Sequence, residues 1–489
     1  MTQWHTHRLP ADDRAAQEGQ AAQAHRLRRQ WTIVVTVLIV VMVVVTTGLL
    51  VWWRQSGSGT ARSDWQPPPQ TLLSSSMRVM PTPGWRISSA ELGLPAQTRF
   101  ATNDNAFQSR PFIGYLDHRA YFLARSIGAT PPDWWLVGVD VRDGTRLFPP
   151  VSLTTSITSP PVCDLNGPDM VLCLRNDAEA GTAWVIEAQT GAVSFSGPTD
   201  LRTYPGQLGV EQVGMFAVAG GTDKGLSGVG RKGEPTWFVP GDGSVDQRYR
   251  DRSDFDSPSL ATQTIGGRGS ETKVVFSLID GTVVSPKVDG DRRPLGAVVY
   301  PGGFAVEVGP ETNRITSNPN QVWFYDGAGK QLARTDVSGN LAINSWDLPI
   351  VTSSSGATVF TTDGHPLAEI PRLDTITRAR LIGHWLFVDE AQSSAFPKWQ
   401  QYDLQTGAPG RACEVSFGAY VGTDGDVGVL QINNPGAGFV AKAVDLATCE
   451  TLWRLPSQVD SFAQVWRADT TLVQLSDDGT ELMSLVAPS

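Results

Sequence analysis

A short strand–turn–strand unit recurs along this chain and constrains its fold more than any other feature. In the clearest copy, residues 134–148 (WWLVGVDVRDGTRLF), side chains alternate with a period of two, which is typical of a strand with one buried face. Asp143-Gly144 then predicts a tight turn, because both residue types tolerate a positive φ. Related units occur at 183–195, 322–333, 400–410 and 441–453. One hairpin cannot bury its apolar face alone, so the copies are expected to stack.

The spacing of these units predicts the architecture. Strand–turn–strand endings occur at Asp143-Gly144, Thr190-Gly191, Lys232-Gly233, Asp280-Gly281, Gly329-Lys330, Asp363-Gly364, Thr406-Gly407, Thr448-Cys449 and Asp478-Gly479. Most intervals are roughly 40–50 residues, the size of a four-stranded propeller blade, although the interval before Asp363-Gly364 and the last one are shorter. The final unit has only three strands, and residues 85–92 are placed to complete it and close the ring. We therefore predict an all-β propeller of about eight blades, with seven as the alternative and one ending an inserted hairpin.

Residues 31–53 form an apolar run without a single charge. Its 23 residues would reach about 34 Å as a helix, enough to cross a hydrocarbon core of roughly 30 Å. The run is too long for the core of a cleaved signal peptide. The flanking arginines are Arg14, Arg26, Arg28 and Arg29 before the run and Arg54 and Arg62 after it, an imbalance that puts the N-terminus in the cytoplasm. We predict a transmembrane signal anchor in the cell membrane, with the C-terminal domain extracytoplasmic.

The other segments follow from composition. Residues 1–30 are polar and are expected to be a solvated cytoplasmic tail. Residues 54–84 are rich in Pro, Ser and Gly and are interpreted as a free linker of up to roughly 90–100 Å, although Trp65 and Leu72-Leu73 could dock onto another surface. Residues 85–489 are the predicted extracytoplasmic propeller.

Four cysteines, all in the body of the chain, are expected to form two disulfides, because disulfides persist in exported domains. Cys163 and Cys173 flank the turn Asn166–Asp169 and can face each other across a hairpin. Cys413 ends one unit and Cys449 lies in the turn of the next, so their bond would join neighbouring blades. Other pairings, and free buried thiols, remain open at this point.

The repeat resembles the PQQ-type propeller repeats of quinoprotein alcohol dehydrogenases and of a non-enzymatic lipoprotein of outer-membrane assembly. The resemblance rests on an acidic residue, a turn glycine and an aromatic at fixed spacing, and its best matches are Asp140/Gly144/Phe148, Glu187/Gly191/Phe195 and Asp445/Cys449/Trp453. It implies a propeller in which the aromatic side chain docks each blade on its neighbour. The dehydrogenases of the family commonly clamp the quinone with adjacent cysteines, and no two cysteines are adjacent here. We therefore expect no quinone and no other cofactor.

No motif in the sequence predicts catalysis. His118, His365 and His384 are the histidines after the apolar run, and none has metal-ligand spacing to another. GDGSVD at 241–246 begins like a calcium loop but lacks the expected sixth-position Gly and twelfth-position Glu. With 49 acidic against 39 basic residues, the chain carries a formal net charge of −10, which disfavours nucleic acid as a partner.

These observations predict a non-enzymatic scaffold or accessory subunit that binds unidentified proteins of the cell envelope. The alternative is a sensor or binder of a small ligand or a wall glycan, for which Trp134 or Trp399 would have to lie on an open face. A quinoprotein dehydrogenase is a third hypothesis. The binding surface is expected at one end of the ring, with the long loops 242–260 and 308–321 contributing to it.

Overall fold

The computed structural model describes most of the chain from residue 64 onward. The described ranges are 64–100, 110–154, 159–176, 181–203, 208–221, 225–246, 255–266, 272–286, 288, 292–310, 320–337, 339–345, 347–371, 378–389, 398–432, 435–458 and 462–488. The tail at 1–30 and the apolar run at 31–53 lie outside them. Within these ranges, no helix has the length and apolar character needed to cross a bilayer.

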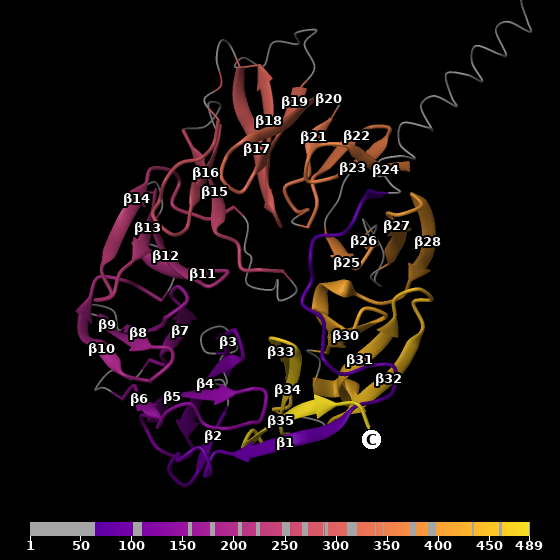
Figure 1. Ribbon diagram of the computed structural model, residues 1–489. Helices are drawn as coiled ribbons and strands as arrows, with labels where there is room; N and C mark the ends of the chain where they lie inside the picture. Colours follow the sequence, from indigo (N-terminus) through magenta and orange to yellow (C-terminus); the bar gives the residue numbers. More distant parts are fainter. Residues whose placement is uncertain are drawn as a thin grey trace, which may run out of the picture. The chain divides into compact units, whose positions relative to one another are not determined.

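The described strands form nine antiparallel sheets that succeed one another around a ring (Figure 1). We number them as blades 1 to 9 in chain order. Blade 1 comprises β2 (Thr98–Arg99), β3 (Phe112–Leu116), β4 (Arg119–Ser126), β5 (Trp134–Asp140) and β6 (Val151–Ser152). Blade 2 comprises β7 (Val162–Leu165), β8 (Met170–Asn176), β9 (Gly181–Glu187) and β10 (Val193–Thr199). Blade 3 comprises β11 (Gly209–Val213), β12 (Phe216–Gly221), β13 (Gly225–Val229) and β14 (Pro235–Val239). Blade 4 contains β15 (Leu260–Ile265) and β16 (Thr272–Ser277).

The second half of the ring continues in the same order. Blade 5 comprises β17 (Arg292–Tyr300), β18 (Gly303–Pro310), β19 (Asn320–Asp326) and β20 (Gln331–Val337). Blade 6 comprises β21 (Asn340–Leu341), β22 (Ile350–Ser353), β23 (Gly356–Phe360) and β24 (Pro366–Pro371). Blade 7 comprises β25 (Ala379–Ile382), β26 (Trp385–Asp389), β27 (Trp399–Asp403) and β28 (Ala408–Cys413). Blade 8 comprises β29 (Tyr420–Thr423), β30 (Val427–Gln431), β31 (Phe439–Asp445) and β32 (Thr451–Pro456), with short 3-10 helices at Phe417–Ala419 and Pro435–Ala437. Blade 9 comprises β33 (Val465–Ala468), β34 (Thr471–Leu475), β35 (Glu481–Val486) and β1 (Thr82–Ser88).

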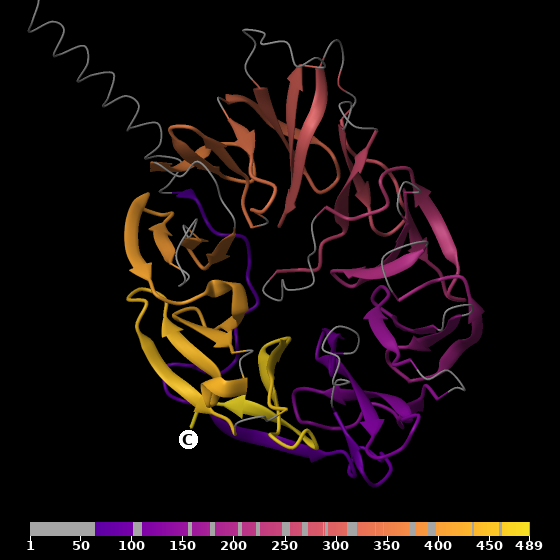
Figure 2. The same ribbon diagram turned by 180° about the vertical axis from the view of Figure 1, so that it is seen from behind.

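Blade 9 closes the ring with strands from both ends of the described chain. Its order is β1-β35-β34-β33, and β1 runs antiparallel to β35 with Ile87 opposite Leu482. Figure 2 shows the indigo β1 beside the yellow C-terminal strands. The prediction that residues near 85–92 complete the last unit is confirmed, with the strand itself at Thr82–Ser88.

The predicted count of eight blades, and the alternative of seven, are wrong: the described residues form nine sheets. The interval before Asp363-Gly364 is short because β21 has only two residues and β22 only four, yet blade 6 is a full blade. The last interval is short for a different reason. Asp478-Gly479 joins the second and third strands of blade 9, whereas the other predicted endings lie between a third and a fourth strand.

Blade 4 is a complete blade although only two of its four strands are regular. Only β15 and β16 are regular, but main-chain bonds from Asp242 and Asp246 to Thr264 and Thr262 supply an irregular inner strand. On the other side, an isolated bridge between Phe276 and Val283 marks a short outer strand. The segment GDGSVD, which begins like a calcium loop, is therefore the inner edge of blade 4.

The core lies between neighbouring sheets. One buried cluster joins blades 3, 4 and 5 and includes Val218 and Phe276, and another joins blade 9 to blade 1 and includes Ile87 and Phe122. Each middle strand is covered on both faces, which explains why several of them are apolar throughout. At roughly 25 cal/mol per Å² of apolar surface removed from water, these contacts are the main force that holds blade to blade.

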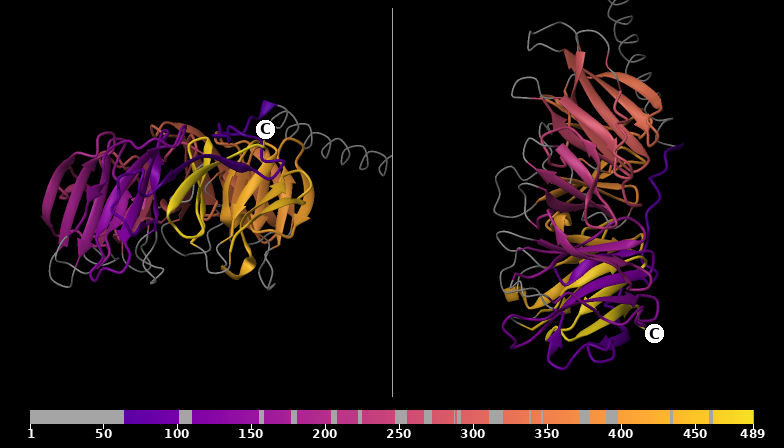
Figure 3. Two further views of the ribbon diagram at one scale, coloured as in Figure 1. Left: turned by 90° about the horizontal axis from the view of Figure 1, so that it is seen from below. Right: turned by 90° about the vertical axis from the view of Figure 1, so that its left-hand side faces the viewer.

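Residues 64–81, which we call the N-terminal strap, differ from the predicted free linker. Trp65, Leu73 and Met77 are 8%, 6% and 1% exposed. Figure 3 shows the indigo strap running along one side of the ring. The apolar side chains in this Pro-rich stretch stabilise it on the blades, and the compact unit begins at Asp64, so the predicted boundary at residue 85 is too late.

Candidate functional site: the two faces of the ring

The antiparallel topology gives the ring two different ends. The turns between first and second strands and between third and fourth strands lie at one end, which we call the turn face. The connections between second and third strands, and from one blade to the next, lie at the other end, the loop face. In the regular blades, every described third–fourth turn belongs to the turn face, including Asp143-Gly144 and Thr190-Gly191.

The turn glycines receive a side chain from the preceding blade. Gly144 has a φ of +78°, and a β-carbon there would lie 2.6 Å from the indole of Trp85 in β1. Gly191, with a φ of +70°, meets Phe148 of blade 1 in the same way. Glycine is needed for two reasons: only glycine adopts a positive φ without cost, and the aromatic ring leaves no space for a side chain. The inter-blade role that the resemblance implied for Phe148 is thus confirmed.

The acidic residue of the motif organises the turn. The carboxylate of Asp445 accepts the N–H groups of Ala447 and Thr448 (3.0 and 2.9 Å) and the Thr448 hydroxyl (3.2 Å). Burial alone would raise the pKa of Asp445, but these bonds, with one from Arg78, hold it below its usual value. Asp140 is similar: its pKa is lowered first by the side-chain bond from Arg142.

Two of the remaining motif residues make the expected contacts, and Trp453 does not. Glu187 precedes the Thr190 turn and accepts the hydroxyl of Thr190 at 3.0 Å. Phe195 packs in the cluster between blades 2 and 3. Trp453 of blade 8 finds no turn to dock on, because the third and fourth strands of blade 9, β35 and β1, are not joined by a turn. Its indole N–H donates instead to the carbonyl of Met77 in the strap, at 2.7 Å.

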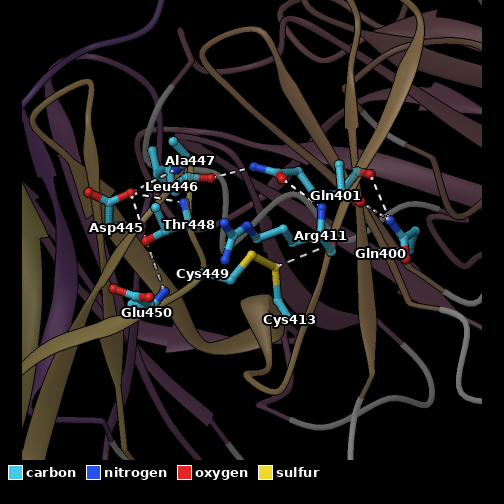
Figure 4. Close-up of a disulfide and its surroundings, with 11 residues drawn as sticks. Gln400, Gln401, Arg411, Cys413, Asp445, Leu446, Ala447, Thr448, Cys449 and Glu450 are labelled. Carbon is cyan, nitrogen blue, oxygen red and sulfur yellow. Dashed lines mark hydrogen bonds between the residues drawn. A yellow bond between two sulfur atoms is a disulfide. The ribbon is translucent and has the colours of Figure 1, made fainter.

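Both predicted disulfides are present. Cys163 and Cys173 lie opposite each other in β7 and β8, with 4.0 Å between their Cα atoms. Cys413 of β28 is bonded to Cys449 in the turn of blade 8, so this bond joins two blades (Figure 4). Two disulfides are typical of a protein in an oxidising, extracytoplasmic environment.

The strap covers part of the turn face. The side chain of Gln70 bonds the main chain of blade 7 at 2.9 Å. The N–H groups of Leu73 and Ser74 donate to Thr423 and Thr470, in the first–second turns of blades 8 and 9, at 2.7 and 2.9 Å. The strap therefore bridges three consecutive blades at the place where the ring closes.

A second segment lies on the same face. Ser257 accepts the N–H of Met215 in a turn of blade 3 at 2.8 Å, and Phe255 joins a buried cluster with Trp65 and Leu348 of blade 6. Residues 255–259 extend toward the middle of the ring before they enter β15 (Figure 1). The strap and this segment thus meet in one apolar cluster on the turn face.

The two loops predicted to share a binding face are at opposite ends. Residues 255–259 of the loop 242–260 lie at the turn face, where Leu278 donates to the carbonyl of Ser259. The loop 308–321 joins the second and third strands of blade 5, so its described ends belong to the loop face. The sequence could not separate them because blade 4 carries its insertion between its first and second strands rather than between blades.

Buried polar groups between blades were not predicted. Glu307 of blade 5 is 4% exposed and accepts the N–H of Leu341 in blade 6 at 2.8 Å and the side chain of Asn320 at 2.7 Å. Burial raises its pKa. Asp347 of blade 6 similarly accepts the N–H of Leu381 in blade 7 at 2.7 Å. A polar residue in a strand or turn gives no sequence signal of such a role.

The other residues considered for chemistry lie apart. His118, His365 and His384 occupy three separate turns. Trp134 and Trp399 are 0% and 1% exposed, so neither can stack on a sugar at an open face. In the described part of the chain, no three His, Cys, Asp or Glu side chains are grouped closely enough to hold a metal ion.

Comparison with known proteins agrees with the blade count. The model of a family described as a conjugation-associated nine-bladed β-propeller domain matches residues 57–488. An uncharacterized protein of Mycolicibacterium smegmatis (strain MKD8) is 42% identical over 441 residues, which cover 88% of this chain and 89% of that protein. BamB from Moraxella catarrhalis is 9% identical with a TM-score of 0.33, covering 83% of this chain and 98% of its own. A eukaryotic initiation factor is 12% identical with a TM-score of 0.43, covering 81% and 96%. The chain belongs to the family of conjugation-associated nine-bladed β-propeller domains.

Proposed function

We propose that this protein is a membrane-anchored, extracytoplasmic and non-enzymatic scaffold subunit of a conjugation apparatus. The observation that carries the proposal is the match of a conjugation-associated family model over residues 57–488. The divergent motif at Asp140, Glu187 and Asp445 is proposed to be a PQQ-like blade motif without the quinone site.

The proposed location rests on two features. The disulfides favour an oxidising compartment, and the uncharged run at 31–53 has the length of a membrane-spanning helix. Because the strap packs on the ring, only residues 54–63 remain as a free tether in this proposal. Ten residues span at most about 35 Å, whereas a tether formed by the whole 54–84 segment would span roughly 90–100 Å.

The loop face is the proposed partner surface. The turn face carries the strap and residues 255–259, whereas connections of many different lengths end at the loop face. Propeller-type scaffolds bind through such variable connections because a rigid framework holds them in place. Ile127, 43% exposed in the second–third connection of blade 1, marks this face.

The test is genetic and then chemical. Deletion of the gene from a conjugating donor should abolish or strongly reduce transfer while growth stays normal, and the intact gene should restore it. Unchanged transfer would contradict the proposed role in conjugation.

A photo-crosslinking amino acid placed in intact cells distinguishes the faces. At Ile127, on the loop face, it should capture the same envelope protein in repeated experiments. The matched control is the exposed strap residue Val79 on the turn face, where no such capture is expected. Capture from Val79 alone would assign the partner to the turn face instead. Capture from neither position, with transfer still lost on deletion, would contradict the scaffold role.

A further inference from the structure

The residue in the turn of blade 8 departs from the rule followed by the other turns. Glycine with a positive φ fills this position in blades 1 to 7: Gly144, Gly191, Gly233, Gly281, Gly329, Gly364 and Gly407. In blade 8 the same position is Cys449, and it keeps the left-handed conformation with a φ of +59°. Its N–H donates to the carbonyl of Asp445 at 2.8 Å, as the N–H of Gly144 donates to Asp140. A non-glycine residue is disfavoured here, so another interaction must hold it.

The side chain that should dock on this turn is also replaced. In blades 1 to 3 an aromatic follows the turn glycine by four residues, as Phe148 follows Gly144, whereas in blades 4 to 6 this position holds a small residue. In blade 7 this position is Arg411, which extends from β28 alongside the disulfide toward the turn of blade 8 (Figure 4). Two residues further on, Cys413 reaches Cys449 and bonds to it. A covalent bond therefore stands where the junctions 9–1, 1–2 and 3–4 place an aromatic ring on a glycine.

The other side of blade 8 depends on the strap. There Trp453 bonds to Met77, and Arg78 forms an ion pair with Asp445 at 3.1 Å. Asp445 belongs to the same turn as Cys449, so the turn of blade 8 contacts both the disulfide and the strap. Loss of the disulfide would release a turn to which the strap is attached.

We propose that the Cys413–Cys449 disulfide is a redox-dependent clasp that holds the closing sector of the ring, blades 7 to 9 and the strap. In the closing reaction, the two thiols lose two protons and two electrons to the disulfide of a thiol–disulfide oxidoreductase, which becomes a dithiol, and one sulfur–sulfur bond forms in the protein. A dithiol reductant reverses this reaction: the dithiol becomes a disulfide, and Cys413 and Cys449 become thiols again. Cys449 is only half-buried, so a small dithiol can reach it.

The clasp ties closure of the ring to the compartment. Before oxidation, junction 7–8 lacks both its covalent bond and an aromatic ring on the turn, so the turn of blade 8 and the strap open more readily than in the oxidised protein. The other disulfide cannot act in this way, because Cys163 and Cys173 lie in one hairpin whose strands are already paired on both sides of the bond.

Hydrogen exchange of the full-length protein in detergent micelles, with and without a dithiol reductant, tests the clasp. Reduction, or the pair Cys413→Ser and Cys449→Ser, should raise exchange at least ~10-fold in β28, β32 and the strap. The control pair Cys163→Ser and Cys173→Ser should leave those three segments unchanged. Unchanged exchange after reduction of Cys413–Cys449 would overturn the proposal.

A rescue variant separates this role from a general effect on folding. Cys449→Gly with Cys413→Ala and Arg411→Trp rebuilds the aromatic dock used at junctions 9–1, 1–2 and 3–4. It should recover the protection of β28, β32 and the strap and no longer respond to reductant. If the rebuilt junction stays as open as the double Ser variant, the disulfide does not replace the dock, and the inference fails.

Discussion

Replacement of Trp453 by Phe tests the contact through which the strap closes the ring. The indole of Trp453 is 8% exposed, and its N–H donates to the carbonyl of Met77 at 2.7 Å. Phenylalanine keeps most of the apolar contact but leaves this buried carbonyl without its donor, which costs about 1–3 kcal/mol. A loss of about 2 kcal/mol in the free energy of opening corresponds to a ~30-fold faster exchange of the strap amides.

The matched control is Trp237→Phe in blade 3. Trp237 occupies the same motif position and packs against Gly281, but its indole N–H makes no hydrogen bond within the described residues. This change should cost about 1 kcal/mol or less, from lost apolar area alone, and should leave exchange in the strap unchanged. Hydrogen exchange followed by mass spectrometry reads both effects by segment. Equal effects of the two variants on the strap, or none from Trp453→Phe, would refute the reasoning.

Three further changes test the account at separate places. Leu73→Ala should destabilise the docked strap by about 2–5 kcal/mol and make residues 64–81 sensitive to protease, and a protease-resistant strap would contradict its docking. Gly191→Ala should lower the melting temperature more than Gly302→Ala, because both have a positive φ but only at Gly191 would the new β-carbon lie 2.4 Å from Phe148; equal shifts would argue against the aromatic dock. Burial raises the pKa of Glu307, so the contribution of this carboxyl to stability is present at low pH and is lost as the pH rises through the raised pKa. In chemical unfolding, the stability of Glu307→Gln relative to the natural protein should therefore increase between pH 4 and pH 7. A flat or opposite trend would contradict the buried carboxyl.

The sequence predicted the features that local chemistry determines. The turn residues of all nine endings, the strand that closes the ring and both disulfides follow from period-two alternation, glycine and cysteine placement. The blade count was wrong because equal spacing between turns was assumed. Spacing does not show that Asp478-Gly479 joins the second and third strands of its blade, whereas Asp363-Gly364 joins the third and fourth strands of its own.

Long-range contacts could not be predicted in the same way. The composition of the strap is that of a linker, and only the surface of blades 6 to 9 gives Trp65 and Leu73 a place to pack. The carboxyl of Glu307 is identified as an inter-blade contact only by the N–H of Leu341, 34 residues away. The place of Cys449 at a turn-glycine position is readable from the motif, but the ion pair between Arg78 of the strap and Asp445 of the same turn is not.

The central claim is a closed ring of nine blades whose last blade takes its outer strand from the N-terminal side. An electron cryomicroscopy map or crystal structure of the full-length protein tests it most directly. The account predicts nine sheets around one axis, with residues 82–88 paired to residues 481–486. A ring of eight blades, or a last blade whose outer strand comes from any other segment, would contradict it.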